Sequence, residues 1–475
     1  MEELVAQCEQ DCDDDAESII TGERYGVIAH IIDECLTKAP AKMSTSEKID
    51  RVVTNRILGL PIFVVIMFCV YYIAVSTLGG TVTDFTNDQL FGTDGWYVLG
   101  QGRDAYDAAV AAAGDDADSV DPAQYGPYVP GITTVVHDAL VAGGTEDGGL
   151  VDSLVCDGIV GGLGAIFGFV PQMFLLFVML SFLEDCGYMA RVAFVMDKPL
   201  RKIGLSGRSI VPMLIGFGCS VPAIMATRTV SSDRDRKMTI LLTPYMSCSA
   251  KISIYAFFTA AFFPRYRALV MLGLYVLGIL IGILAALIMN KTAFRGKPVP
   301  FVMELPNYRM PGLKSVALLL WEKAKDFLQR AFTVIFLATI IIWFLQSFDT
   351  RLNVVADSAN SLLALIGQFL APVFRPLGFG DWRCATALIS GFIAKESVVS
   401  TLQVLLGGAA ISSLLTTRSA ISFLVFTLLY TPCVAAIATI RRELDSRLKT
   451  VGVVVLQCSV AWVVALAAYA IAGLV

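Results

Sequence analysis

A cysteine stands among helix-breaking residues inside an apolar segment. The stretch 216–228 reads GFGCSVPAIMATR and places Cys219 between Gly218 and Pro222. Breaking a helix leaves backbone carbonyls and amides unpaired, which a membrane tolerates only where protein or a watery cavity surrounds them. A thiol that can become a thiolate suits late first-row divalent metals far better than Na⁺ or Mg²⁺. The pattern predicts a metal-binding break, although a buried cysteine can also pack as a small apolar side chain.

Two more apolar segments pair a proline with a thiol. Cys433 directly follows a proline in YTPCVAAIATIR, and Cys248 follows one by four residues in LLTPYMSCSAKISIY. Three thiols that each lie near a proline indicate a metal site more specifically than any one of them does alone. We therefore expect Cys219, Cys248 and Cys433 to be metal ligands, with simple packing as the alternative for each. Met246 and Ser249 can add weak ligands beside Cys248.

Charged residues in or beside apolar segments form a second group of candidates. Lys395 and Glu396 stand deep in SGFIAKESVVSTL, while Glu184 and Asp185 end another apolar run. A charge at the centre of a membrane helix costs about 2.5–3.5 kcal/mol or more, so such residues usually have a function. A carboxylate can coordinate the metal or relay protons, and a lysine can neutralise the site when it is empty. The alternatives are a structural salt bridge or exposure at the membrane surface.

The composition indicates the class of protein that must position these groups. Of the 475 residues, 56% are hydrophobic and 16% charged, and several apolar runs approach or exceed the roughly 20 residues that span a bilayer. We predict an all-α, polytopic helical membrane protein with about eight to ten transmembrane segments, two of them interrupted or re-entrant. The expected spans are 57–78, 157–183, 238–263, 267–290, 331–348, 384–406, 418–440 and 450–474, with 209–227 as a shorter, interrupted one.

Charge placement predicts the orientation. Basic residues precede the first span, whereas loop 79–155 holds thirteen acids against one base, Arg103. The positive-inside rule then places the N-terminus in the cytoplasm and this loop outside. The loop can concentrate cations at an entrance or act only as a soluble cover, and it can contain short helices near 102–113 and 131–142. The side on which the C-terminus lies stays open.

A weak internal repeat predicts two similar halves. Glu184 precedes Cys219 by 35 residues, and Glu396 precedes Cys433 by 37 residues. After each cysteine comes an Ala-Ile pair and then an arginine. Transporters build binding sites near the middle of the membrane from two such halves with interrupted helices. Short apolar stretches of sequence can also match each other by chance.

The expected domain organisation follows from these features. The parts are a cytoplasmic helical linker at 1–50, a first transmembrane half at 51–290, a cytoplasmic connector at 291–330 and a second transmembrane half at 331–475. Interrupted segments are expected at 209–228 and 430–442. Within the linker, Cys8 and Cys12 stand one helical turn apart and can bind metal, although a solvated acidic linker is the favoured explanation.

Several functions are excluded by missing motifs. The chain contains no G-x-x-x-x-G-K-[ST] nucleotide-binding loop and no HExxH, GxSxG or kinase signature. We therefore expect no enzymatic activity in this chain. The basic run near Arg441–Lys449 is explained as a membrane-flanking anchor, so no nucleic acid is expected as a partner.

The quoted stretches, together with LEDCGYMARVAFVMDKPLRKIGLSGRSIVPMLIGFGCSVPAIMATRT, resemble the membrane domain of the FeoB family of prokaryotic ferrous-iron transporters. The resemblance runs from about residue 20 to 475. It implies Fe²⁺ uptake across the cytoplasmic (inner) membrane through Gate-type segments at 209–228 and 430–442. The family's membrane cysteines fall on Cys219, Cys248 and Cys433.

The resemblance also implies partners. Family members carry an N-terminal G domain that uses GTP and Mg²⁺, and residues 1–50 look like only the end of the region that follows it. We therefore expect a G domain in cis or in trans, from either a longer chain or a separate subunit. Small cytoplasmic Feo accessory proteins and a homo-oligomer are further possible partners. Competing functions are transport of another divalent metal such as Mn²⁺ or Zn²⁺, transport of a nucleoside, and a membrane receptor or scaffold.

Overall fold

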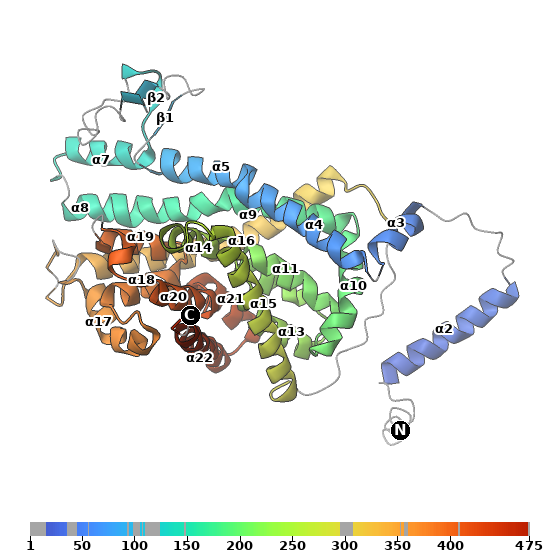
Figure 1. The fold of residues 1–475 in the computed structure, drawn as a ribbon. Helices are drawn as coiled ribbons and strands as arrows, with labels where there is room; N and C mark the ends of the chain where they lie inside the picture. The colour runs from blue at the N-terminus through green and yellow to red at the C-terminus, as the bar shows by residue number, and fades with distance from the viewer. Residues whose placement is uncertain are drawn as a thin grey trace. The chain divides into compact units, whose positions relative to one another are not determined.

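The protein is an all-α, polytopic helical membrane protein in the computed structural model (Figure 1). The structure describes residues 16–35, 45–55, 57–92, 95–97, 105–106, 108–109, 124–146, 149–294, 307–351, 353–355, 360–406 and 409–473. Cys8 and Cys12 lie outside these residues. The chain divides into two compact units, Met1–Val52 and Val53–Val475, and each is described by itself.

The N-terminal unit contains the helix expected from the sequence. Helix α2 spans Ala16–Cys35, and α3 begins at Thr45 and ends at Val53. Apolar side chains of α2 at helical spacing are exposed, including Tyr25, Ile28 and Ile31.

Two long helices open the membrane unit. The first covers Gly59–Leu90 and consists of α4 (Gly59–Tyr71), α5 (Leu78–Asp84) and the π-helical segments η1 (Tyr72–Ser76) and η2 (Phe85–Leu90). The second covers Leu150–Asp185 and consists of α8 (Leu150–Ser153), the π-helical η6 (Leu154–Val160) and α9 (Gly161–Asp185). Helices α5 and α9 pack together. Both ends of the expected loop 79–155 are therefore helical continuations of the spans.

The segment between these two helices contains little regular structure in its described part. Strands β1 (Trp96–Tyr97) and β2 (Tyr128–Val129) pair antiparallel, with Trp96 opposite Val129. Helix α7 spans Ile132–Ala142, where the sequence predicts one. Most of the other expected helix, near 102–113, lies outside the described residues.

Runs of short helices precede and follow the long helices in the rest of the unit. The first group comprises α10 (Tyr188–Lys202), α11 (Ile210–Gly218), α12 (Ser220–Ala226), α13 (Asp233–Leu242), α14 (Ser249–Phe262) and α15 (Arg267–Lys291). The second comprises α16 (Leu313–Ser347), α17 (Leu362–Phe374), α18 (Trp382–Ile393), α19 (Ser397–Leu406), α20 (Thr417–Leu429), α21 (Val434–Leu444) and α22 (Arg447–Ile471).

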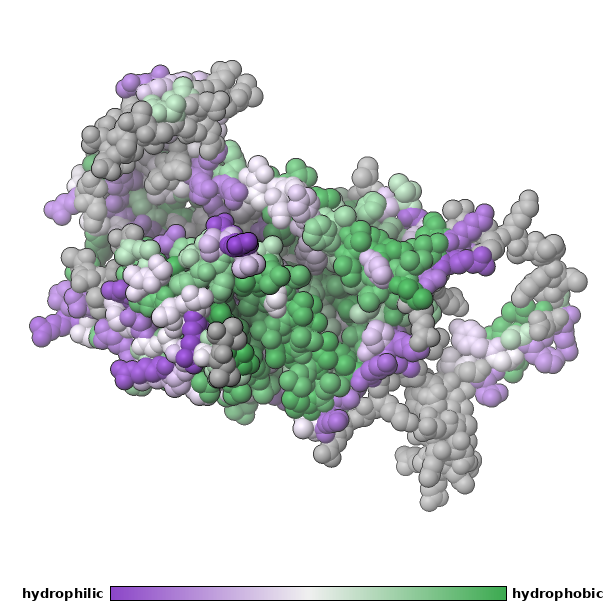
Figure 2. Space-filling model, viewed as in Figure 1, coloured by the Kyte–Doolittle hydropathy of each residue, from purple (hydrophilic) through white to green (hydrophobic). Residues whose placement is uncertain are grey.

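Fewer simple spans are present than the sequence predicts. Within the described residues, five helices are long and apolar enough to cross a membrane, and the pair 362–377 and 382–393 forms a sixth candidate bent by 105°. Segments 209–227, 238–263 and 384–406 are each divided into shorter helices instead. Figure 2 shows a broad hydrophobic surface over α15, where Leu269, Leu272 and Leu280 are exposed. A surface of this kind suits contact with lipid.

Candidate metal site in a cavity between broken helices

A cavity of about 680 Å³ lies where the short helices meet. Cys219, Cys248 and Cys433 all line it, together with Lys395 and Glu396. Residues of α5, η2, α9 and α16 complete the wall. The structure therefore brings the three predicted thiols and the two predicted membrane charges to one space.

The first break separates α11 from α12. Cys219 has extended backbone angles (φ −151°, ψ 135°) between the two helices. The carbonyl of Gly218 accepts a hydrogen bond from the Ser249 hydroxyl at 3.1 Å. A Cβ atom at Gly218 would meet the end of the Leu176 side chain, so glycine at this position allows α9 to approach closely.

The second break precedes α14 and is held by a buried lysine. Cys248 is extended (φ −77°, ψ 165°) directly before α14. The ammonium group of Lys251, which is 2% exposed, donates to the carbonyls of Pro244, Met246 and Leu428 at 3.0, 3.2 and 2.7 Å. All three donors of the ammonium group are used. Lys251 thus compensates carbonyls that the broken helices leave unpaired.

The third break lies between α20 and α21. Tyr430 is extended (φ −66°, ψ 164°) after α20, and Cys433 is extended (φ −60°, ψ 159°) directly before α21. The proline at position 432 removes a backbone donor at this point. The sequence predicts this interruption.

The fourth break was not predicted from the sequence. Ala394 is extended (φ −135°, ψ 123°) after α18, and α19 begins at Ser397. Lys395 and Glu396 therefore lie between two helices rather than within one. The Lys395 ammonium is 2.9 Å from the ring centroid of Tyr430 and has no hydrogen-bond partner among the described residues.

The four breaks share one arrangement. Cys219, Cys248 and Cys433 immediately precede helices α12, α14 and α21, and Glu396 immediately precedes α19. The N-terminus of a helix is the positive end of its dipole and stabilises negative charge there. A helix N-terminus also favours thiolate over thiol. The helix N-termini therefore direct unpaired backbone N–H groups toward all four side chains, which offsets part of the cost of placing an anionic metal ligand in this buried space.

The possible ligands are not gathered into one compact set. Among the described residues, no three of the Cys219, Cys248, Cys433 and Glu396 ligand atoms lie within 4.8 Å of one another. In this arrangement an ion would contact one or two of them at a time, with carbonyls and hydroxyls of the breaks completing its coordination.

The remaining predicted site residues differ in their relation to the cavity. Ser249 lines it. Met246 is buried but is not part of the lining, and it contributes its carbonyl to Lys251. Glu184 and Asp185 lie at the end of α9 and are also not part of the lining. The Asp185 carboxylate pairs instead with the Arg309 guanidinium at 2.5 Å.

The cavity also contains polar side chains that sequence reasoning missed. Asn87, Gln172 and Gln346 line it, as does Asp84. Asp84, Asn87 and Gln346 lie near the ends of long helices, where a polar residue in the sequence is common and indicates nothing specific. The position of Gln172 beside Pro171 inside an apolar run was the only available signal.

An ion pair joins the two interrupted segments that contain Cys219 and Cys433. The Arg228 guanidinium, which follows α12, donates from Nε and Nη2 to the Glu443 carboxylate of α21 at 2.9 and 2.6 Å. The Glu443 side chain is 4% exposed and that of Arg228 is 47% exposed. Helices α12 and α21 also pack against each other, so the two interrupted segments contact one another directly.

Comparison with known families agrees with this architecture. A family model described as "Gate: Nucleoside recognition" matches residues 166–262 and 328–447, which contain all four breaks. Models for the C terminus of ferrous iron transport protein B and for the FeoB cytosolic helical domain match 271–323 and 1–37. The chain belongs to the FeoB family.

Individual FeoB relatives align over most of the chain. The Fe(2+) transporter FeoB of Staphylococcus aureus is 35% identical over 91% of this chain, and that of Methanocaldococcus jannaschii is 34% identical over 90%. A relative from Porphyromonas gingivalis, 34% identical over 96% of the chain, is named as a fusion of Fe(2+) transport protein A with FeoB. The chain spans 60%, 59% and 55% of these three relatives. The chain therefore aligns with a part of longer proteins that are named as Fe(2+) transporters.

Proposed function

We propose that this FeoB chain conducts Fe²⁺ across the membrane through the cavity between the broken helices. The observation that supports it most is that Cys219, Cys248, Cys433 and Glu396 each precede a helix and line one cavity. Thiolates favour late first-row metals. The curated relatives are named as Fe(2+) transporters.

The scattered arrangement of these ligands suits transport better than storage. A site that conducts must bind well enough to admit the ion and weakly enough to release it. A closed four-thiolate site would hold the metal structurally. An ion that meets one or two thiols at a time, with carbonyls such as that of Gly218, stays exchangeable and can pass from one ligand to the next.

Lys395 would act as a counter-ion in the empty cavity. Lys395 lines the cavity beside Glu396, and its buried ammonium group lies over the Tyr430 ring and makes no hydrogen bond to the described residues. An incoming Fe²⁺ would be repelled by this charge, so Lys395 must turn away or lose its proton as the ion enters. Lys251, whose donors are all used, would keep its position.

The direction of transport and the partners are part of the proposal. The N-terminus would lie in the cytoplasm of a prokaryotic cell and the acidic segment outside the inner membrane, so that Fe²⁺ moves inward. A G domain in cis or in trans would supply GTP-dependent regulation. The fusion named in the P. gingivalis relative supports a small accessory protein as a partner. A homo-oligomer is a further partner that the proposal allows.

Anaerobic Fe²⁺ binding and uptake test the proposal. In detergent, Cys219→Ser, Cys248→Ser and Cys433→Ser should each weaken binding at the cavity by at least about 10- to 100-fold, the range typical of losing a residue that only supports a metal ligand. The same variants should lower Fe²⁺ accumulation by cells that express the protein with its G domain. Cys384→Ser is the matched control, because this thiol is fully buried in α18 away from the cavity. Unchanged binding and uptake in the triple variant would refute the ligand assignment.

A nucleoside is the alternative cargo, and one observation favours it. The carboxamides of Asn87, Gln172 and Gln346 line the cavity, and such groups can hydrogen-bond a base or ribose. The volume of the cavity lies within the range of small-molecule sites. Saturable nucleoside binding that Gln172→Leu abolishes, with no Fe²⁺ binding, would select this cargo instead.

A further inference from the structure

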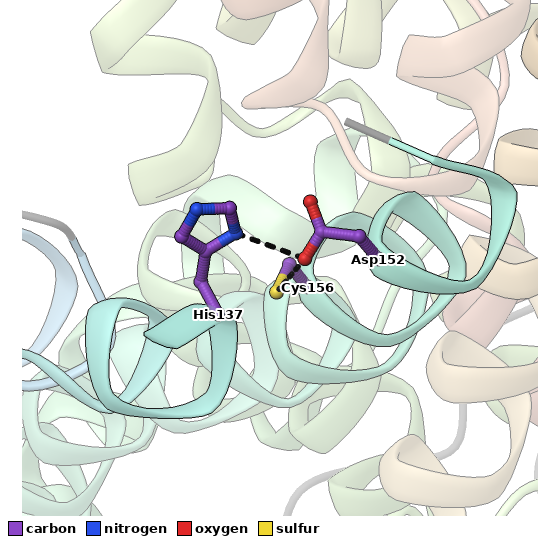
Figure 3. Close-up of side chains that lie close together, drawn as sticks. All are labelled: His137, Asp152 and Cys156. Carbon is purple, nitrogen blue, oxygen red and sulfur yellow. Dashed lines mark hydrogen bonds and ion pairs between the residues drawn. The ribbon is translucent and has the colours of Figure 1, made fainter. Parts of the chain in front are cut away.

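A second group of metal-binding side chains lies away from the cavity. His137 of α7, Asp152 of α8 and Cys156 of η6 each offer a ligand atom within 4.8 Å of the other two (Figure 3). His137 Nδ1 is 2.9 Å from Asp152 Oδ1, and Cys156 Sγ is 3.3 Å from the same oxygen. None of the three lines the cavity.

We propose that His137, Asp152 and Cys156 bind one late first-row divalent metal ion. Imidazole, carboxylate and thiolate are the ligand types that Zn²⁺ and its first-row neighbours share. Metal–ligand distances of about 2.0–2.3 Å place tetrahedral ligand atoms about 3.3–3.6 Å apart. The observed separations need to widen by only a few tenths of an ångström to accept an ion.

The arrangement of the three groups argues against a catalytic thiol. In a nucleophilic site the histidine lies between the thiol and the carboxylate, so that it can take the thiol proton. Here the carboxylate lies in the middle and contacts both other groups. A shared carboxylate flanked by two further donor atoms fits a metal ion, which would displace the thiol proton to solvent and bind the unprotonated Nδ1 atom.

Exposure indicates an exchangeable ion. The Asp152 side chain is 9% exposed and that of His137 is 34% exposed. Three protein ligands leave one tetrahedral position for water, as in open rather than closed metal sites. The ion can therefore reach the site from solvent.

The supporting helix holds two of the ligands in place. Asp152 and Cys156 are four residues apart, which places them on one helical face. Between them, the Ser153 hydroxyl accepts a hydrogen bond from the Trp343 indole of α16 at 3.0 Å. Cys156 lies in the π-helical segment η6, and such segments occur frequently at functional sites. A bound ion would tie α7 to this fixed helix.

The position of the site follows from helix length. The helix Leu150–Asp185 has 36 residues, which corresponds to about 54 Å, whereas the hydrocarbon core of a bilayer is about 30 Å thick. Cys156 precedes Gln172 of the cavity wall by 16 residues, or about 24 Å along the helix. The site therefore lies near one membrane surface and is separate from the cavity.

Anaerobic Co²⁺ titration of the full chain tests this site independently of transport. The background replaces Cys8, Cys12, Cys219, Cys248 and Cys433 with serine, so that neither the N-terminal thiols nor the cavity thiols contribute. We expect one equivalent of Co²⁺ with a thiolate charge-transfer band. Adding Cys156→Ser should abolish the band, and His137→Ala should weaken binding at least tenfold. Cys186→Ser is the matched control, because this half-buried thiol follows the other end of the same helix.

Two outcomes would overturn the proposal. One is the absence of a thiolate band in the background protein, and the other is a band that survives Cys156→Ser. If Cys156→Ser does not fold, His137→Ala decides the question alone, because His137 is partly exposed and the thiol remains. Co²⁺ should also raise the Tm of the background protein but not that of its His137→Ala form.

Discussion

Two buried lysines line the same cavity but stand in opposite environments. Lys251 and Lys395 are 2% and 3% exposed. Lys251 donates to three carbonyls released by broken helices, whereas Lys395 contacts the Tyr430 ring and makes no hydrogen bond to the described residues. A buried charge that is fully hydrogen-bonded stabilises its surroundings, while one without such bonds is costly and is usually retained for function.

The largest expected effect is the difference in stability between two matched variants. Lys251→Met keeps the side-chain length but leaves three carbonyls without their donor, so we expect the free energy of unfolding to fall by about 3–5 kcal/mol. Lys395→Met removes a buried charge that has no hydrogen bond to the described residues, so it should leave the free energy of unfolding unchanged or raise it. Thermal unfolding of both variants in one detergent measures the contrast. Equal losses would show that the two lysines do the same structural work.

A second prediction concerns the ion rather than the fold. Lys395→Met should bind Fe²⁺ about tenfold more tightly than the unaltered protein, because a positive charge in a low-dielectric cavity opposes a cation. Uptake should nevertheless fall, since a more tightly held ion is released more slowly. Lys395→Arg, which keeps the charge, is the control. Unaltered affinity in Lys395→Met would remove the counter-ion role.

The Arg228–Glu443 pair provides an intermediate case of burial. Arg228 is about half exposed while Glu443 is buried, so Glu443→Gln should lower the free energy of unfolding by about 1–2 kcal/mol. The nearby Arg442→Gln change serves as a control, because this residue is exposed. Thermal unfolding again gives the measurement. A loss as large as that of Lys251→Met would contradict the expected dependence on burial.

The smallest effect is expected at an exposed pair. Asp233 lies at the start of α13, and a hydrogen bond from Lys237 lowers the pKa of its carboxyl group. A lowered carboxyl pKa in the folded state contributes stability above the unfolded value near 3.9, and this contribution is lost as the pH falls through the folded pKa. Because solvent screens the pair, the contribution should be below about 1 kcal/mol.

Asp233→Asn should therefore lower stability slightly at pH 7 and make no difference near pH 2. Thermal unfolding of both proteins across pH 2–7 measures this. A difference that grows as the pH falls would have the wrong sign for a carboxyl group with a lowered pKa.

The sequence predicts those features of the cavity that depend on residue type. Apolar run length predicts the helical membrane class, and glycine or proline beside Cys219, Cys248 and Cys433 predicts an interruption at each thiol. The break at Ala394–Glu396 was not predicted in the same way, because a glycine alone, Gly391, precedes it by three residues and no proline occurs from Phe392 to Ser400. That break separates two charged side chains from a helix and leaves them at the cavity. Tertiary packing, rather than local preference, determines it.

Features that depend on contacts between residues far apart in the chain also could not be predicted from the sequence. Asp152 and Cys156 are visibly one helical turn apart, but nothing in the sequence places His137 against them. The continuation of the spans through 79–90 and 150–155 was hidden by polar residues and glycines that usually indicate a loop. The sequence likewise pairs Glu184 with Glu396 in its repeat, whereas only Glu396 lines the cavity.

The helix Leu150–Asp185 connects several distant parts of the molecule. It presents Cys156 near one end, Gln172 at the cavity and Asp185, held by Arg309, at the other end. Pro171 cannot donate an intrahelical hydrogen bond, so we expect the helix to bend most easily beside Gln172. A tilt of the segment on one side of Pro171 would move the cavity wall and strain the ion pair between Asp185 and Arg309. A movement at one surface of the bilayer can in this way be transmitted through the helix to the other surface.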